Sequence, residues 1–171
     1  MSSSLGAQRG PQIGVVGAAE CGPDLAALAT DVGAGLARAG VVLLTGGRSG
    51  VMAAASAGAR RAGGLVIGVL PGGDAAATPP NPDVEVALFT GLGQARNQVL
   101  ALSAAAVIAI GGGWGTLSEI AIALKHRVPV VALRSWRLAR PDGAAEPLFH
   151  ELAEGTAAEA VDLALALALG R

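Results

Sequence analysis

The sequence predicts a single three-layer α/β domain, in which a mostly parallel sheet carries helices on both faces. The first observation is length, because 171 residues is an ordinary size for one domain and is enough to bury a core. The second is that short runs of branched aliphatic residues alternate with longer alanine-rich stretches. The third is that these runs lack strict apolar and polar alternation, which indicates strands that are covered on both faces.

Six apolar runs are the strand candidates. They lie at residues 13–16, 41–44, 65–70, 84–89, 107–110 and 130–133. Most of the stretches between them have the length and composition of helices, as a parallel sheet requires for its crossovers.

The helices follow from periodicity and from end signals. Leu25, Leu28, Val32 and Leu36 recur at helical spacing, and Gly40 follows them as a C-terminal cap would. Further helices are predicted over residues 49–62, 93–102, 116–126 and 156–169. The segment 71–83 contains four prolines, so we expect an exposed loop there rather than a helix or a central strand.

Composition excludes several classes of protein. The chain is 52% hydrophobic and 15% charged, which is incompatible with a disordered protein. Its net charge is −1, it has no tyrosine and no basic block, so we expect no nucleic-acid partner. The single cysteine, Cys21, cannot form an internal disulfide, and no Cys/His cluster has the spacing of a zinc site, so we expect no bound metal.

The ends of the chain suggest a cytoplasmic protein. Residues 1–12 lack the basic and apolar regions of a secretory signal and are expected to form a flexible tail before a domain over residues 13–171. The most apolar stretches, 99–110 and 161–169, fall short of the roughly 18 residues that a membrane-spanning helix needs. We therefore expect no membrane segment.

Glycine-rich turns follow two of the predicted strands and open the next helices. Glycine permits positive φ and leaves backbone N–H groups uncovered, and a helix start adds partial positive charge, so such turns bind anions. Two of them at the carboxyl edge of one parallel sheet would form a crevice for a phosphorylated small molecule. The alternative is that both are simply tight corners. The candidate binding residues are Gly46, Gly47, Arg48, Ser49 and Gly50 in the first turn, and Gly111, Gly112, Gly113, Trp114, Gly115 and Thr116 in the second.

Neither turn has the spacing of a better-known nucleotide or catalytic motif. Neither reads G-x-G-x-x-G, and Thr45 rather than an acid ends the second strand, which disfavours an NAD-dependent dehydrogenase. No Walker loop is present, and the only lysine, Lys125, lies far from both turns, which disfavours ATP hydrolysis and pyridoxal phosphate chemistry. The first turn is not a G-x-S-x-G nucleophile elbow either.

Arg96 and Glu119 are the candidate catalytic residues. A guanidinium can grip a phosphate, and a fixed carboxylate can stabilise the cationic sugar carbon that forms when an N-glycosidic bond breaks. Each has a structural alternative. Thr116 and Glu119 have the spacing of a capping box, and Arg96 could be a solvated residue at a helix start.

Trp114 and the arginines near Trp136 are weaker candidates. Trp114 could cover a bound ring or fill a corner of the fold. The arginines 134, 137 and 140 are interpreted as part of a solvated loop or sheet edge.

Three motifs together resemble the Lonely-guy (LOG) or SLOG superfamily, once labelled possible lysine decarboxylases. They are TGGRSGVM at 45–52, GLGQARN at 91–97 and GGGWGTLSE at 111–119, in the order the superfamily has them, and the resemblance covers nearly the whole chain after residue 12. It implies a Rossmann-like fold and a homodimer or homotetramer.

Two branches of the superfamily imply different functions. One contains phosphoribohydrolases, which cleave a nucleoside 5'-monophosphate to base and ribose 5-phosphate with an Arg and a Glu that correspond to Arg96 and Glu119, and which require no cofactor. The other contains molybdenum cofactor carriers, which hold a phosphorylated pterin without turnover. Ile110 and Asn97 stand where the hydrolases have proline and lysine, and both are similar to the carrier branch.

The retained Arg96 and Glu119 favour the hydrolase as the first hypothesis, with the carrier as the alternative and the molybdenum cofactor as its ligand. A regulatory domain that senses a nucleotide remains a third hypothesis.

Overall fold

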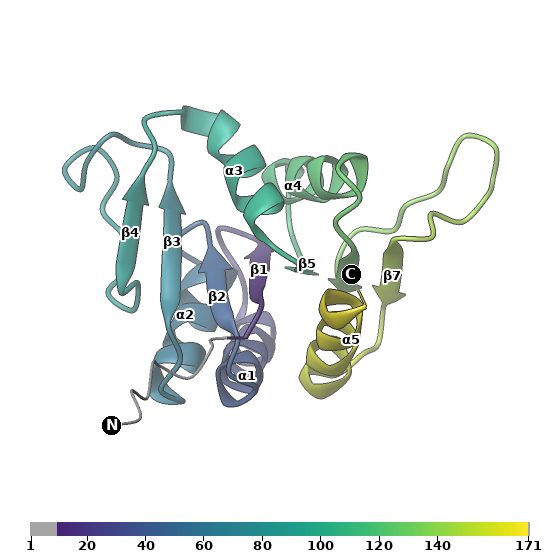
Figure 1. Cartoon of the computed structure of the whole chain (residues 1–171), viewed down its shortest axis with the longest axis horizontal. Helices are drawn as coiled ribbons and strands as arrows, with labels where there is room; N and C mark the ends of the chain where they lie inside the picture. The colour runs from purple at the N-terminus through teal and green to yellow at the C-terminus, as the bar shows by residue number, and fades with distance from the viewer. Residues whose placement is uncertain (1–9, 171) are drawn as a thin grey trace, which may run out of the picture.

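The computed structural model describes residues 10–170, and over this range the chain forms one seven-stranded sheet whose strands are all parallel (Figure 1). The strands are β1 (Gln12–Gly17), β2 (Val42–Thr45), β3 (Val66–Leu70), β4 (Val86–Phe89), β5 (Ala106–Ile110), β6 (Val130–Leu133) and β7 (Phe149–Leu152). The helices are α1 (Pro23–Arg38), α2 (Val51–Arg61), α3 (Arg96–Ser103), α4 (Trp114–Lys125) and α5 (Ala157–Leu169), with a short 3-10 helix, η1 (Gly93–Ala95), before α3.

Helices cover both faces of the sheet. Consecutive residues of β1 point to opposite faces, so Val15 enters a core with α1, α2 and α5, while Val16 enters a second core with α3 and α4. Both side chains are almost completely buried. The predicted three-layer, Rossmann-like architecture is therefore confirmed.

Most predicted elements match the observed ones to within two residues at each end. Residues 93–95, predicted as the start of an α-helix, instead form η1. The segment 71–83 contains no helix or strand, as its prolines predict. The tail predicted over residues 1–12 lies mostly outside the described residues, and its last residue, Gln12, already belongs to β1.

Strand β7 is absent from the prediction. Its sequence, FHEL, is short and half polar, and none of its residues is fully buried. It pairs with β6 at the edge of the sheet, where one side of the strand needs no partner. The histidine and the glutamate of β7 interrupt its apolar run, whereas β4, at the other edge of the sheet, keeps an unbroken one.

The order of the strands puts β1 at the centre. From β1 the chain builds β2, β3 and β4 to one side, then returns through α3 and places β5, β6 and β7 on the other side. In open parallel sheets, ligands bind outside the carboxyl ends of the strands where the order reverses. The glycine-rich turns after β2 and β5 flank β1 at that point.

No helix within residues 10–170 is long and apolar enough to cross a membrane. The same range contains no group of three or more His, Cys, Asp or Glu side chains arranged to hold a metal ion.

Helices α1 and α2 cross at two glycines that bring their backbones into contact. A Cβ added to Gly33 would lie 2.0 Å from the carbonyl oxygen of Ala55, and one added to Gly58 would lie 2.0 Å from that of Thr30. Because the clashing atoms belong to the backbone, the two helices would have to move apart to accommodate a Cβ at either position.

Gly33→Ala is therefore expected to lower the free energy of unfolding by about 2 to 4 kcal/mol, as measured by urea denaturation. Gly115→Ala is the matched control, because this helical glycine has open space around its Cβ position. It should leave stability unchanged or raise it slightly, by less than about 1 kcal/mol. Equal effects of the two substitutions would contradict the packing assigned to α1 and α2.

Candidate functional site

A small cavity lies outside the carboxyl ends of β1, β2 and β5. Its volume is about 210 Å³. It joins the two glycine-rich turns, since it is lined by one residue of the first and several of the second. The predicted site residues in its wall are Arg48, Arg96, Gly113, Gly115, Thr116 and Glu119.

The remaining residues of the first turn shape the cavity without lining it. The guanidinium of Arg96 lies directly over Gly46, where an added Cβ would come within 2.7 Å of Arg96 Nη1. Gly47 and Gly50 both have positive φ, and a Cβ on Gly50 would lie 2.2 Å from the carbonyl oxygen of Ala18. The Ser49 hydroxyl donates to the carbonyl of Ala19 over 2.9 Å, which ties the turn to the end of β1.

The residues of the second turn line two different spaces, since Gly113, Gly115 and Thr116 line the cavity and two others do not. Gly111 and Gly112 line a separate hollow of about 370 Å³ together with Arg134 and Trp136. Trp114 lines neither hollow. It is 79% exposed, and its ring lies 5.5 Å from that of Trp136.

The interpretation of Thr116 and Glu119 as a capping box is wrong. Helix α4 begins two residues earlier than predicted, with Gly113 as its N-cap and no side chain capping it. Thr116 therefore occupies the third helical position and cannot act as the cap. The capping box of this fold is instead formed by Thr156 and Glu159 at the start of α5.

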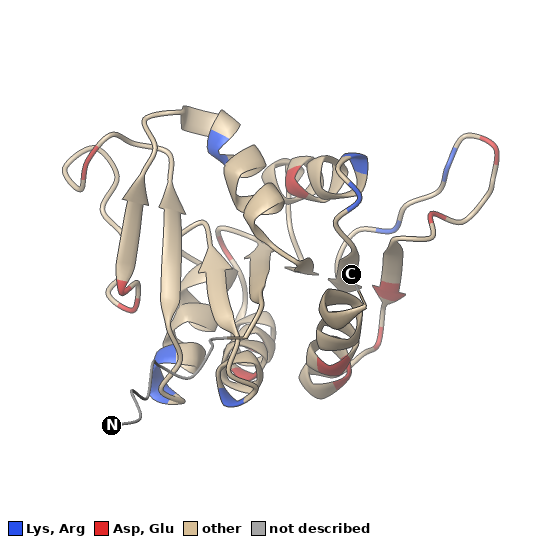
Figure 2. Cartoon of the chain, viewed as in Figure 1, with Lys and Arg blue, Asp and Glu red and all other residues tan. Residues whose placement is uncertain are grey.

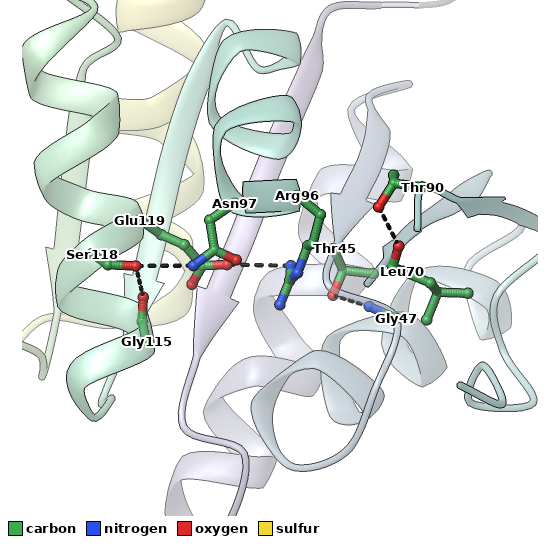
Figure 3. Close-up of polar contacts among 9 residues, drawn as sticks. All are labelled: Thr45, Gly47, Leu70, Thr90, Arg96, Asn97, Gly115, Ser118 and Glu119. Atoms are coloured by element: carbon green, nitrogen blue, oxygen red, sulfur yellow. Dashed lines mark hydrogen bonds and ion pairs between the residues drawn. The ribbon is translucent and has the colours of Figure 1, made fainter. Parts of the chain in front are cut away.

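Without a capping role, Glu119 pairs with Arg96. Nη1 of Arg96, at the start of α3, lies 3.3 Å from Oε1 of Glu119 in α4 (Figure 3). The two side chains are only 11% and 7% exposed. Most other charges lie at helix ends or in loops, and strands β1 to β6 carry none (Figure 2). Among the ion pairs of the described residues, this is the one in which both side chains are largely buried.

Burial changes the acidity of both partners. Desolvation raises the pKa of Glu119 to about 7, and the neighbouring Arg96 charge only partly opposes this rise. Desolvation also lowers the pKa of Arg96, and the Arg48 charge adds to this effect while Glu119 opposes it. The positive charge of Arg48 beside Arg96 makes the cavity favourable for an anion.

Asn97 and Ser118 are functional candidates that the sequence did not single out. Asn97 is buried beside Arg96, and its Nδ2 donates to Ser118 Oγ over 2.9 Å. The Ser118 hydroxyl in turn donates to the carbonyl of Gly115 over 2.8 Å (Figure 3). In the sequence, the only signal was that Asn97 stands where the hydrolases have lysine.

A larger groove of about 580 Å³ adjoins the cavity, and Arg48 lines both. The proline-rich loop forms one wall of the groove through residues 77–81. Asn81 holds this loop against the first glycine turn, because its Nδ2 donates to the carbonyl of Arg48 over 3.0 Å and its backbone N–H donates to that of Gly47 over 2.8 Å.

Known proteins resemble this chain in sequence, and two of them resemble it in fold. The molybdenum cofactor carrier protein from Chlamydomonas reinhardtii is 37% identical, covers 95% of this chain and 100% of its own, and superimposes with a TM-score of 0.82. The molybdenum cofactor binding protein from the phototrophic bacterium Rippkaea orientalis is 46% identical over 77% of this chain and 80% of its own, with a TM-score of 0.71. An uncharacterised protein of Archaeoglobus fulgidus is 43% identical over 72% of this chain and 80% of its own.

A family model described as the SLOG cluster4 family matches residues 10–164, which include every element from β1 to the middle of α5. The resemblance inferred from the three glycine-containing motifs is confirmed. The chain belongs to the SLOG cluster4 family.

Proposed function

We propose that this protein binds the molybdenum cofactor, a phosphorylated pterin, and holds it without turnover. The observation that carries the proposal is the similarity to the Chlamydomonas carrier over 95% of the chain. This favours the carrier hypothesis over the hydrolase that the sequence placed first.

The residues of the cavity fit the phosphate end of such a ligand. The first turn of α4 lines the cavity, and its backbone N–H groups have no partner within the helix, while Gly113 and Gly115 leave open space beside them. Arg48 supplies a cation at the mouth, while Arg96 is fixed deeper by Glu119.

The adjoining groove fits the ring system. Its volume of about 580 Å³ is within the range of small-molecule sites, and Pro79, Pro80 and Ala53 give it apolar walls. Because Arg48 lines both spaces, one ligand can place its phosphate in the cavity and its rings in the groove. When bound, the cofactor supplies a redox-active metal centre, and this chain's residues bind, orient and shield it.

A homodimer or homotetramer is part of the same proposal. Apolar side chains that a second copy could cover are exposed on β4 and the segment after it, namely Val86, Leu88, Phe89 and Leu92.

One observation favours a second function, phosphoribohydrolase activity. The Arg96 and Glu119 side chains, far apart in the sequence, meet in the cavity. A carboxyl whose pKa is about 7 can hold a proton for a departing base near neutral pH.

The carrier proposal predicts retention of about one molybdenum atom per chain after gel filtration, when purified protein is mixed anaerobically with cofactor released from a molybdoenzyme. Arg48→Ala should weaken binding about ten- to hundredfold, because a charge-assisted contact with the phosphate is lost. Arg61→Ala, the same charge change at the far end of α2, should bind normally. Failure of the unmodified protein to retain molybdenum would contradict the proposal.

Incubation with a panel of nucleoside 5'-monophosphates separates the two functions. A carrier releases no ribose 5-phosphate, and Glu119→Gln behaves as the unmodified protein does. Release that falls about 10²- to 10³-fold in Glu119→Gln would instead establish the hydrolase.

The raised pKa of Glu119 predicts a specific dependence of stability on pH. The folded state binds a proton more tightly than the unfolded state does, so the contribution of Glu119 is greatest below its ordinary pKa of 4.5 and is lost as pH rises to about 7. We subtract the free energy of unfolding of Glu119→Gln from that of the unmodified protein. This difference should fall by about 3 kcal/mol as pH rises across this window. A difference that stays constant or grows with pH would show that the pKa of Glu119 is not raised in the folded protein.

A further inference from the structure

The side-chain oxygen of Asn97 is buried and accepts no hydrogen bond from any residue that the structure describes. The residue is 3% exposed, and its Oδ1 has no partner among the described residues. Buried polar groups are nearly always hydrogen-bonded, so an unpaired acceptor in the wall of a cavity indicates that a ligand supplies the donor.

The orientation of the Asn97 amide is fixed by its neighbours. Because the Ser118 hydroxyl donates its hydrogen to the carbonyl of Gly115, it can only accept from Asn97, and the group that faces it must be the NH₂. The amide oxygen is thereby turned toward the pair of Arg96 and Glu119 (Figure 3).

The cavity therefore combines donors with acceptors. Its donors are Arg48, Arg96 and the first backbone N–H groups of α4. Its acceptors are the Asn97 oxygen and the Glu119 carboxylate. All of these groups belong to residues that line one space of about 210 Å³.

We propose that Asn97 and Glu119 make the cavity selective for an anion that carries a proton, namely a terminal phosphate with a P–OH group, and against sulfate and phosphodiesters. The P–OH donates to these acceptors, whereas a fully ionised oxyanion leaves Asn97 unpaired and, above the pKa of Glu119, is repelled by its carboxylate. A phosphomonoester can bind or retain such a proton near neutral pH because its second ionisation lies at about pH 6.

This inference rests on the proposed function and narrows it. A pterin whose phosphate is a terminal monoester is accepted. A form whose phosphate is esterified to a nucleotide lacks the P–OH at that position and is rejected.

Inorganic phosphate and sulfate provide the test, with affinities measured by isothermal titration calorimetry at about pH 8.5, where both are mainly dianions and Glu119 is ionised. Only hydrogen phosphate then carries a proton. The unmodified protein should bind phosphate at least about tenfold more tightly than sulfate, because a site built to accept a hydrogen bond rejects an analogue that lacks the donor. Equal affinities, or no binding of phosphate, would overturn the proposal.

Three variants identify the source of the preference. Asn97→Leu should bring the two affinities to within a few-fold of each other, while Asn97→Asp, which keeps an acceptor, should retain the preference for phosphate. Ser118→Ala releases the amide to turn its NH₂ inward, so sulfate binding should strengthen relative to phosphate. An unchanged preference in Asn97→Leu would overturn the role of Asn97.

Thermal unfolding without anion distinguishes this role from a structural one. Asn97→Leu removes an unpaired buried acceptor together with the hydrogen bond to Ser118, and because these two effects oppose each other its unfolding midpoint should stay close to that of the unmodified protein. A lower midpoint together with an unchanged anion preference would mean that Asn97 serves only the fold.

The test is separable from that of the carrier function. Selective phosphate binding by a protein that retains no molybdenum would contradict the carrier function alone. Retention of the cofactor with equal affinities for phosphate and sulfate would contradict the selectivity alone.

Discussion

The position of β1 between β2 and β5 is the constraint on which the site depends. All strands run parallel, so the turns after β2 and β5 emerge at one edge, separated only by the width of β1. Return of the chain through α3 also brings Arg96 to this edge, above Gly46 and opposite Glu119. A fold with β5 beside β4 would contain the same motifs and no shared cavity.

Burial of the Arg96 and Glu119 pair gives the site its electrostatic character. Desolvation disfavours both charges, as the opposite shifts of their pKa values indicate, and the ion pair only partly compensates. Arg96, with Arg48 nearby, favours the binding of an anion in the cavity. Glu119 and Asn97 disfavour an anion that has no hydrogen to donate, because they present acceptors beside the donors. This arrangement is the basis of the proposal that the site recognises an anion with both kinds of group.

Sequence patterns were sufficient where local rules govern the structure. Apolar runs located six of the seven strands, and glycine spacing located both turns, because apolar strands and tight corners leave direct marks on composition. The patterns failed where the structure depends on distant contacts. The TLSE sequence suggested a capping box, yet α4 begins at Trp114, and Glu119 is buried against an arginine 23 residues away. Asn97 could not be identified because its significance lies in an oxygen that lacks a partner, a property that only the packed structure defines.

A crystal structure of the protein grown with a pterin phosphate would test the convergence of the two turns on one ligand most directly. The account predicts the phosphate over the first turn of α4, between Arg48 and Arg96, with the rings in the groove beside Pro79 and Pro80. A ligand bound elsewhere on the molecule, with the cavity filled by ordered water, would contradict it.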